Sequence, residues 1–439
     1  MPTRPQKQAR WQPWLLQACV CLLVLSAWLT GLPARADSAE QLFARFEPAL
    51  LQVRVIERAS TAKSAIGTGF VLQLPTSGER LLVTNYHVVS EAVLFPEKYQ
   101  LEALSQQQQK VPVQVLAVDV INDLALLQSS DPALTSGISF QMAAQKPAQG
   151  ATIYSLGNPH DLGMILVPGT YNGLQKYSYY PRIHFTGSIN SGMSGGPTVN
   201  ADGQVVGVNV ASGGNQLSFL VPGDSLSALL QRYQQQGQTA NFRLDMQTQL
   251  QTSQRVMMDK ILASDWQVKD FGNGKIPDEV TGFIRCWGES NVEKTQDKIK
   301  KVMAFCSQDD LIYLSERFST GPVQMQFLWL QGHDMHPLQF FQQYEQEASN
   351  VRPDNQATKE DVTPFECEQQ VVEQQGRKSK VVYCVRAYRQ FADLYDVLYL
   401  ATSLGDGLEA VSSHYTLAGV SADQAQAFRR KFSEAVSWQ

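Results

Sequence analysis

The length and composition of the chain are those of a globular protein with more than one domain. It has 439 residues, of which 43% are hydrophobic and 18% charged, which excludes a globally disordered chain. At roughly 100–200 residues per domain, the length allows two or three domains. The formal net charge is -5, from 36 basic and 41 acidic residues, so nucleic acid is not an expected partner.

The N-terminus has the pattern of a secretory signal peptide. Arg4 and Lys7 precede an apolar stretch over 14–32, and an A-R-A sequence ends at Ala36. A basic region, an apolar region and a small-residue cleavage site predict a signal peptide over 1–36. The alternative is a retained N-terminal anchor. No run of roughly 18 apolar residues follows, so we expect no stable membrane span after cleavage, and a mature protein in the periplasm or secreted from the cell.

Export also bears on the cysteines, because disulfides form in oxidising compartments. The chain after the signal holds Cys286, Cys306, Cys367 and Cys384, and four cysteines allow three pairings. We favour Cys286–Cys306 and Cys367–Cys384, since each pair flanks segments with the pattern of adjacent strands. A zinc site is disfavoured, because no C-x-x-C spacing is present.

The first half of the chain is predicted to be rich in β-structure. A short helix is expected near 38–46, and strand signals at close spacing over about 180 residues then predict an all-β barrel or sandwich. A short helix over 225–233 ends this domain, which spans 37–232. The expected strands are 51–56, 69–74, 81–84, 111–115, 124–127, 152–156, 183–186, 205–210 and 218–221.

The second half is predicted to form a separate domain. Residues 233–256 are rich in Gln and have the composition of a linker, partly helical. From 257 to 439 helix and strand signals are mixed, which predicts an α+β domain of unknown type after the mostly β first domain. The H-D-M-H sequence at 333–336 is most simply an exposed loop, so no metal site is expected. The expected strands are 283–287, 311–314, 323–330, 381–388 and 397–401, and a helix is expected from 421.

Three segments of the first domain each carry one reactive side chain. His87 follows an apolar run, Asp123 precedes L-A-L-L, and Ser194 lies in the sequence S-G-M-S-G-G-P. Each alone has an ordinary structural explanation: a buried histidine, a capping aspartate or a tight turn. Together they supply what serine catalysis needs, because a serine hydroxyl requires an imidazole to take its proton and a carboxylate to orient that imidazole. The backbone N–H groups of Gly192 and Ser194 are expected to form the oxyanion hole.

The motifs T-N-x-H-V, N-D-L-A-L-L and G-x-S-G-G-P, in this order, resemble those of the chymotrypsin-fold (trypsin-like) serine proteases, and are most similar to the bacterial HtrA (Deg-type) branch. The resemblance covers roughly residues 38–232. It implies two perpendicular six-stranded β-barrels with a triad between them, in which His87 is the general base, Asp123 its orienting acid and Ser194 the nucleophile. Asp119 is the rival acid. Asp123 is preferred because the family's acid directly precedes the L-A-L strand.

The resemblance also implies details of activation and specificity. Met193 stands where zymogen-activated relatives have an aspartate, so we expect a site that is ordered without proteolytic activation. Ser188 stands at the floor of the specificity pocket and is uncharged, which predicts cleavage after small or medium apolar residues. Val210, Ala211 and Ser212 stand where the family pairs an extended substrate as an added strand.

The sequence therefore predicts an exported serine endopeptidase that acts on polypeptides through an acyl-enzyme on Ser194, with no metal or organic cofactor. The alternative is a catalytically silent, protease-like scaffold that binds unfolded or envelope proteins. An esterase is disfavoured, because the serine turn is not a G-x-S-x-G elbow. After residue 232 the sequence has no motif of the PDZ domain that HtrA proteins usually carry, and the sequence does not determine the oligomeric state.

Overall fold

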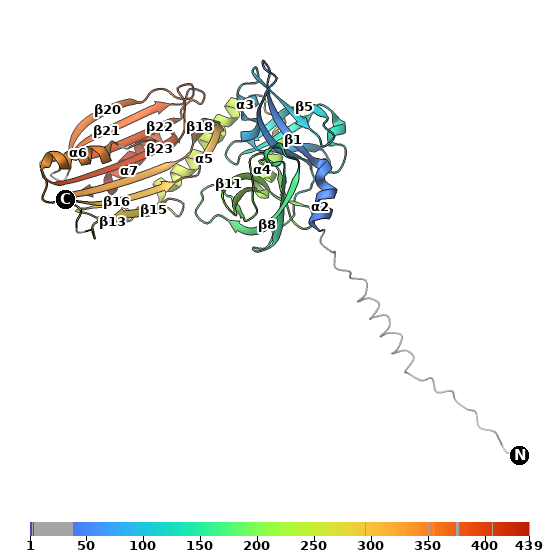
Figure 1. Cartoon of the computed structure of the whole chain (residues 1–439), viewed down its shortest axis with the longest axis horizontal. Coiled ribbons are helices and arrows are strands. Elements are labelled where there is room, and N and C mark those ends of the chain that lie inside the picture. The colour runs from blue at the N-terminus through green and yellow to red at the C-terminus, as the bar shows by residue number, and fades with distance from the viewer. Residues whose placement is uncertain are drawn as a thin grey trace.

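The computed structural model describes residues 38–438 except 295, 350, 354, 375, 376 and 406, together with residues 1 and 3. The predicted signal peptide therefore lies outside the described residues, apart from those two. Figure 1 shows two β-rich bodies side by side, the N-terminal one in blue and green and the C-terminal one in orange and red. Within the described part of the chain, no helix is long and apolar enough to cross a membrane.

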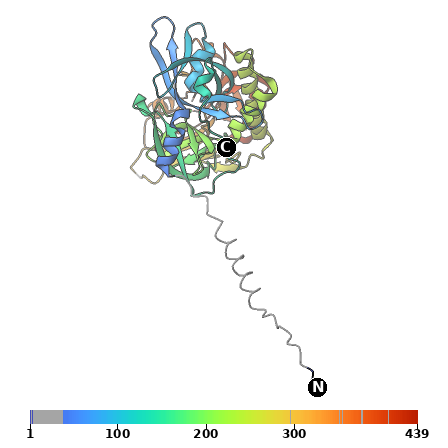
Figure 2. The ribbon, with the colours of Figure 1, turned by 90° about the vertical axis from the view of Figure 1, so that its right-hand side faces the viewer.

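The N-terminal body consists of two closed antiparallel barrels, which Figure 2 shows from their outer side. Helix α2 (Ala39–Phe46) leads into them, and its first turn is closed by reciprocal hydrogen bonds between Ser38 and Gln41. The first barrel is formed by β1 (Leu50–Glu57), β2 (Lys63–Gln73), β3 (Arg80–Thr84), β6 (Leu124–Ser129), β5 (Lys110–Asp119) and β4 (Tyr99–Leu104) in that order. The second is formed by β10 (Pro197–Val199), β11 (Val205–Gly214), β12 (Leu217–Pro222), β9 (Ile183–Phe185), β8 (Ile165–Leu174) and β7 (Thr152–Gly157).

These barrels confirm the predicted mostly β, double-barrel class. Strands β4, β8 and β10 were not among the expected segments. In β8, Pro168, Gly169 and Gly173 weaken the local strand signal, and the strand exists because its backbone pairs with β7 and β9. Two helices complete this half of the chain: α3 (Tyr86–Leu94) inserts after β3, and α4 (Gly223–Gln236) follows β12. Single 3₁₀ turns occupy Glu47–Ala49, Pro132–Thr135 and Pro159–Asp161.

The Gln-rich segment over 233–256 is largely helical. Its first residues end α4, and most of the remainder lies in α5 (Phe242–Ala263), which runs between the two bodies in Figure 1. Met246 and Leu250 of α5 belong to the core shared with the first barrel, whereas Met257 and Ile261 belong to the core of the second domain. The glutamines of α5 are themselves half-buried or buried: Gln249 donates a hydrogen bond to the Val118 carbonyl of the first barrel, and the buried Gln254 donates one to the Ala418 carbonyl of the second domain. Widely spaced apolar residues are then enough to bury the helix.

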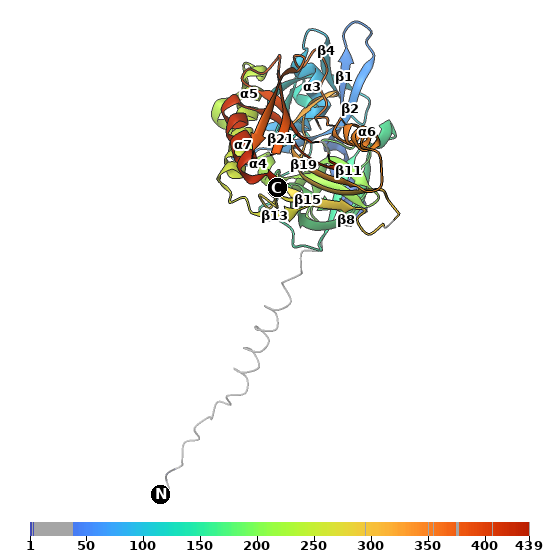
Figure 3. The ribbon, with the colours of Figure 1, turned by 90° about the vertical axis from the view of Figure 1, so that its left-hand side faces the viewer.

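The C-terminal body is built on an antiparallel sheet of seven strands within the described residues. Helices α5 and α7 (Ala422–Ala435) pack on one face and α6 (Pro337–Ala348) on the other, as Figure 3 shows. The sheet order is β15 (Arg285–Ser290), β16 (Ile299–Gln308), β19 (Val323–Gly332), β23 (Glu409–Val420), β22 (Tyr395–Leu404), β21 (Arg377–Ala387) and β20 (Glu366–Gln374). Smaller sheets join β13 (Val268–Phe271), β14 (Gly274–Pro277) and β24 (Ser437–Trp438), and β17 (Ile312–Ser315) and β18 (Phe318–Thr320).

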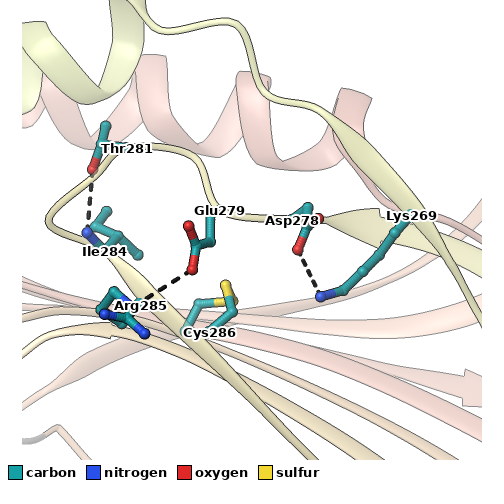
Figure 4. Close-up of a disulfide and its surroundings, with 8 residues drawn as sticks. Lys269, Asp278, Glu279, Thr281, Ile284, Arg285 and Cys286 are labelled. Atoms are coloured by element: carbon teal, nitrogen blue, oxygen red, sulfur yellow. Dashed lines mark hydrogen bonds and ion pairs between the residues drawn. A yellow bond between two sulfur atoms is a disulfide. The ribbon is translucent and has the colours of Figure 1, made fainter.

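Two disulfides join the edge strands of this sheet to their neighbours. Cys286 on β15 lies opposite Cys306 on β16, and Cys367 on β20 lies opposite Cys384 on β21. Figure 4 shows the first disulfide beneath the ion pair of Glu279 with Arg285, whose atoms Oε1 and Nε are 3.5 Å apart. The structure thus contains the pairing favoured from the sequence.

Candidate active site

His87 lies in the first turn of α3, which directly follows strand β3 of the first barrel. Strand β3 ends at Thr84, and Asn85 is the N-terminal flanking residue of the helix. The Asn85 side chain donates a hydrogen bond of 2.7 Å to the backbone carbonyl of Asp123. Asp123 itself lies in the turn from β5 to β6 with φ of 63°, a left-handed conformation that Asp tolerates better than most residues. Asn85 therefore ties the turn with Asp123 to the start of the helix with His87.

The carboxylate of Asp123 contacts His87 at two points. Its Oδ1 accepts a hydrogen bond of 2.8 Å from the His87 backbone N–H, and its Oδ2 lies 2.6 Å from Nδ1 of the ring. The His87 side chain is 27% exposed and the Asp123 side chain is 11% exposed. The carboxylate is thus largely shielded from solvent, while part of the imidazole ring remains accessible to it. With Nδ1 donating to the carboxylate, Nε2 is the nitrogen free to accept a proton.

The electrostatics of the pair favour a charged imidazole. Burial alone lowers the pKa of His87, but the negative charge of Asp123 and its hydrogen bond to the ring together outweigh burial and raise the pKa above 6.5. The rival acid, Asp119, is engaged elsewhere: its Oδ1 accepts hydrogen bonds from the backbone N–H groups of Ile121 and Asn122. The structure therefore places Asp123, and not Asp119, against the imidazole.

The loop that carries Ser194 is clamped between the two barrels. Thr68 of the first barrel donates from its backbone to the Ser194 carbonyl at 2.8 Å and from its hydroxyl to the Gly192 carbonyl at 2.7 Å. On the other side Asn209, a fully buried residue of β11, accepts from the Gly195 N–H at 3.0 Å and donates from Nδ2 to the Met193 carbonyl at 3.1 Å. Sequence reasoning assigned no role to Thr68 or Asn209.

The backbone of this loop leaves two N–H groups, those of Gly192 and Ser194, available as hydrogen-bond donors. The carbonyl of Ser191 accepts a hydrogen bond of 2.8 Å from the His160 N–H, so the N–H of the same peptide, that of Gly192, points the opposite way. Gly192 has φ of 92°, which is accessible to glycine and strained for other residues. Among the described residues, the N–H groups of Gly192 and Ser194 have no backbone acceptor. They are therefore free to bind an oxyanion.

Close packing brings the Ser194 loop to the start of α3. A Cβ added to Gly67 would lie 2.5 Å from the Val88 side chain and 3.1 Å from the Ser194 carbonyl oxygen. A Cβ on Gly195 would lie 2.9 Å from the Asn85 backbone nitrogen. In the described part of the chain the imidazole is hydrogen-bonded to Asp123 but not to the Ser194 hydroxyl. Such contacts are often long in the absence of substrate and shorten when it binds.

The remaining predicted site residues lie around this loop. Met193 is fully buried in the core of the second barrel. Ser188 is exposed in the segment between β9 and the Ser194 loop, and Ala211 and Ser212 are exposed on β11 next to the half-buried Val210. No group of three or more His, Cys, Asp and Glu residues within the described chain has the arrangement of a metal site.

One contact with His87 was not foreseen. Tyr313 of the second domain lies with its ring centroid 5.8 Å from that of His87, at an interplanar angle of 68°. The sequence indicated only a strand in this region. No local signal could have revealed the contact, because it joins segments of two domains.

Residues 67–208, which lie in the double barrel, match the family model described as a trypsin-like peptidase domain. Serine protease HTRA2, mitochondrial, of Bos taurus is 28% identical over 203 residues, which cover 42% of this chain and 41% of that protein. The probable periplasmic serine endoprotease DegP-like of Rhizobium meliloti (strain 1021) is 31% identical over 169 residues, which cover 36% of this chain and 31% of that protein. The predicted resemblance to HtrA-type serine proteases is thus confirmed.

These similarities each cover less than half of this chain. The matched segments span less than half the length of the two relatives. Among solved structures, the serine endoprotease from Yersinia pestis matches with a TM-score of 0.38 and 24% identity, over 46% of this chain and 68% of that one.

Proposed function

We propose that the protein is an exported serine endopeptidase that hydrolyses polypeptides through an acyl-enzyme on Ser194. The observation that carries the proposal is the contact of the Asp123 carboxylate with the His87 ring, at 2.6 Å, beside the loop that presents Ser194. The sequence similarity to HtrA-type serine proteases supports the same activity. In this proposal His87 is the general base, Asp123 orients it, and Ser194 is the nucleophile.

The proposed reaction begins when Nε2 of His87 takes the proton of the Ser194 hydroxyl as its oxygen attacks the scissile carbonyl. The imidazolium that forms is stabilised by the Asp123 carboxylate, and the oxyanion accepts hydrogen bonds from the N–H groups of Gly192 and Ser194. His87 then returns the proton to the leaving amine, and water hydrolyses the acyl-enzyme by the same steps.

Substrate is proposed to pair with β11. Strand β10 pairs with β11 only as far as Val208, so within the described residues the edge of 210–212 that faces away from β12 carries no neighbouring strand. Backbone groups on such an edge suit an extended peptide. The uncharged Ser188 supports a preference for small or medium apolar residues before the scissile bond.

Export is proposed from several independent observations. The sequence before residue 37 has the pattern of a signal peptide, and the described residues contain two disulfides. A relative in Salmonella typhimurium carries the name periplasmic serine endoprotease DegP. Periplasm and external medium both satisfy these observations.

The test is covalent labelling with a fluorophosphonate probe. We expect the folded wild-type protein to be labelled, Ser194→Ala to remain unlabelled, and Ser349→Ala, at the distant end of α6, to be labelled like the wild type. Casein digestion should follow the same order. A folded wild-type protein that neither reacts with the probe nor cuts casein would overturn the proposal and favour a binding scaffold.

A further inference from the structure

The second domain contacts the helix that carries the catalytic histidine. The hairpin of β17 and β18 lies against α3, where the hydroxyl of Tyr86 donates a hydrogen bond of 2.8 Å to the Leu314 carbonyl. Tyr86 is fully buried and directly precedes His87. The two bonded residues are 228 positions apart in the sequence, so this bond joins the domains immediately behind the active site.

The contact extends to the imidazole through Tyr313. Its ring lies edge-on to both neighbours, with centroid distances of 5.8 Å to His87 and 6.4 Å to Tyr86. Tyr313 is half-buried, and burial raises the pKa of its hydroxyl. A hydrogen bond with Ser90 lowers this pKa, but burial and the nearby carboxylates of Asp123 and Glu316 outweigh it. The tyrosine therefore stays neutral near the His87–Asp123 pair and adds bulk without charge.

The hairpin is anchored by buried side chains. Ile312, Leu314 and Phe318 belong to the same core as the residues of α3. The Phe318 ring packs on Tyr388 at 5.0 Å, and the hydroxyl of Tyr388 donates a hydrogen bond of 2.6 Å to the buried carboxylate of Asp396 on β22. The position of Tyr313 is thus set by the sheet of the second domain.

We propose that Tyr313 is a positioning residue for His87, and that the second domain is therefore part of the catalytic site. The inference rests on the proposed peptidase function. An aromatic ring against the imidazole hinders its rotation away from Asp123 and keeps water from one side of the hydrogen-bonded pair. A small displacement of a catalytic group is enough to slow a reaction by about 100-fold.

The experiment compares full-length Tyr313→Ala and Tyr313→Phe with the wild type. The rate of fluorophosphonate labelling and kcat on a peptide substrate should fall about 10- to 100-fold in Tyr313→Ala, with KM little changed, because the ring acts on the base. Tyr313→Phe keeps the ring and should retain most of the wild-type rate. Tyr383→Ala, a half-buried tyrosine elsewhere in the second domain, is the control for a general loss of stability.

A second readout does not depend on turnover. In a Ser194→Ala background, the downfield proton NMR signal of the His87 Nδ1–H should persist with Tyr313 or Phe at position 313, and should broaden through exchange with water in Tyr313→Ala. If Tyr313→Ala does not fold, Tyr313→Leu replaces it, since leucine keeps apolar packing but lacks the ring.

The outcomes separate the two proposals. A folded Tyr313→Ala or Tyr313→Leu protein with wild-type labelling rate, kcat and Nδ1–H signal overturns the positioning role and leaves the peptidase function intact. A wild-type protein that is neither labelled nor active overturns the peptidase function. The NMR signal then still decides whether Tyr313 holds the ring.

Discussion

Asp123 binds His87 through both oxygens of one carboxylate, with Oδ1 on the backbone N–H at 2.8 Å and Oδ2 on the ring nitrogen Nδ1 at 2.6 Å. The first contact fixes the acid relative to the start of α3, and the second fixes the rotation of the imidazole about its bond to the helix. A single side chain thus sets both the position and the orientation of the proposed base.

Replacing this carboxylate should therefore impair catalysis more than binding. Asp123→Asn is expected to lower kcat on the order of 10⁴-fold, because the amide can donate to Nδ1 and stabilise the wrong tautomer. Asp119→Asn is the matched control, since within the described part of the chain the Asp119 carboxylate accepts hydrogen bonds only in its own turn. Steady-state kinetics on a peptide substrate measure both variants. Equal losses in the two would contradict the assignment of the acid.

The pH profile should reflect the raised pKa of His87. The base works only when neutral, and a raised pKa keeps the ring protonated to higher pH, so kcat/KM should fall on the acid side with a midpoint above 6.5. The same raised pKa stabilises the folded chain below pH 6.5, a contribution that is lost as pH rises through the folded-state pKa.

An NMR titration of the His87 ring checks the cause of this shift. In Asp123→Asn only burial remains, so the ring pKa should fall below 6.5. A ring pKa that does not change in the variant would show that Asp123 does not cause the shift.

The loop that carries Ser194 should not tolerate a side chain at Gly192. A Cβ there would lie 2.4 Å from the Asn158 carbonyl oxygen, so Gly192→Ala must displace the loop. Loss of an oxyanion donor costs about 100- to 1000-fold in rate, and we expect a loss of that size in labelling. Gly173→Ala is the control, because Gly173 has a similar φ of 82° but open space around it. A labelling rate for Gly192→Ala equal to that of Gly173→Ala would refute the assignment.

The disulfides should stabilise the second domain. They close loops of 20 and 17 residues, and a loop of this size contributes about 3 kcal/mol in the chain-entropy account. A reductant should therefore lower the urea concentration at which the second domain unfolds. A variant lacking all four cysteines serves as the control, because the reductant has no bond to break in it. Equal sensitivity of both proteins would contradict the prediction.

A buried histidine in the second domain should make stability depend on pH. His414 lies on β23, neither ring nitrogen has a hydrogen-bond partner among the described residues, and burial lowers its pKa to about 4. The unfolded chain then binds more protons below pH 6.5, so stability should fall from pH 6.5 to pH 4 by up to about 3 kcal/mol from this group. Thermal unfolding measures this effect: between pH 6.5 and pH 4, His414→Leu should lose less stability than His333→Leu. The second variant is the control, because it alters an exposed histidine.

Part of the fold was predictable because its signals are local. Alternating apolar runs with turns between them indicated most strands of the two barrels, and the strand-like segments flanked by the cysteines indicated the disulfide pairing. The helical course of α5 was harder to predict, because its apolar residues are few and its helical state depends on burial against both cores. Strand β8 was missed for a related reason, since its pairing overrides a sequence that holds proline and glycine.

The sequence by itself determined which side chains we propose as the catalytic groups. Serine catalysis needs particular residue types, and His87, Asp123 and Ser194 each stand in a short motif that can be recognised from the sequence alone. The tertiary structure places Asp123 rather than Asp119 against the imidazole, in agreement with the sequence-based preference, and it alone shows that Tyr313 lies beside the ring. Contacts of this kind depend on how whole cores pack, and residues more than two hundred positions apart leave no local pattern that predicts their meeting.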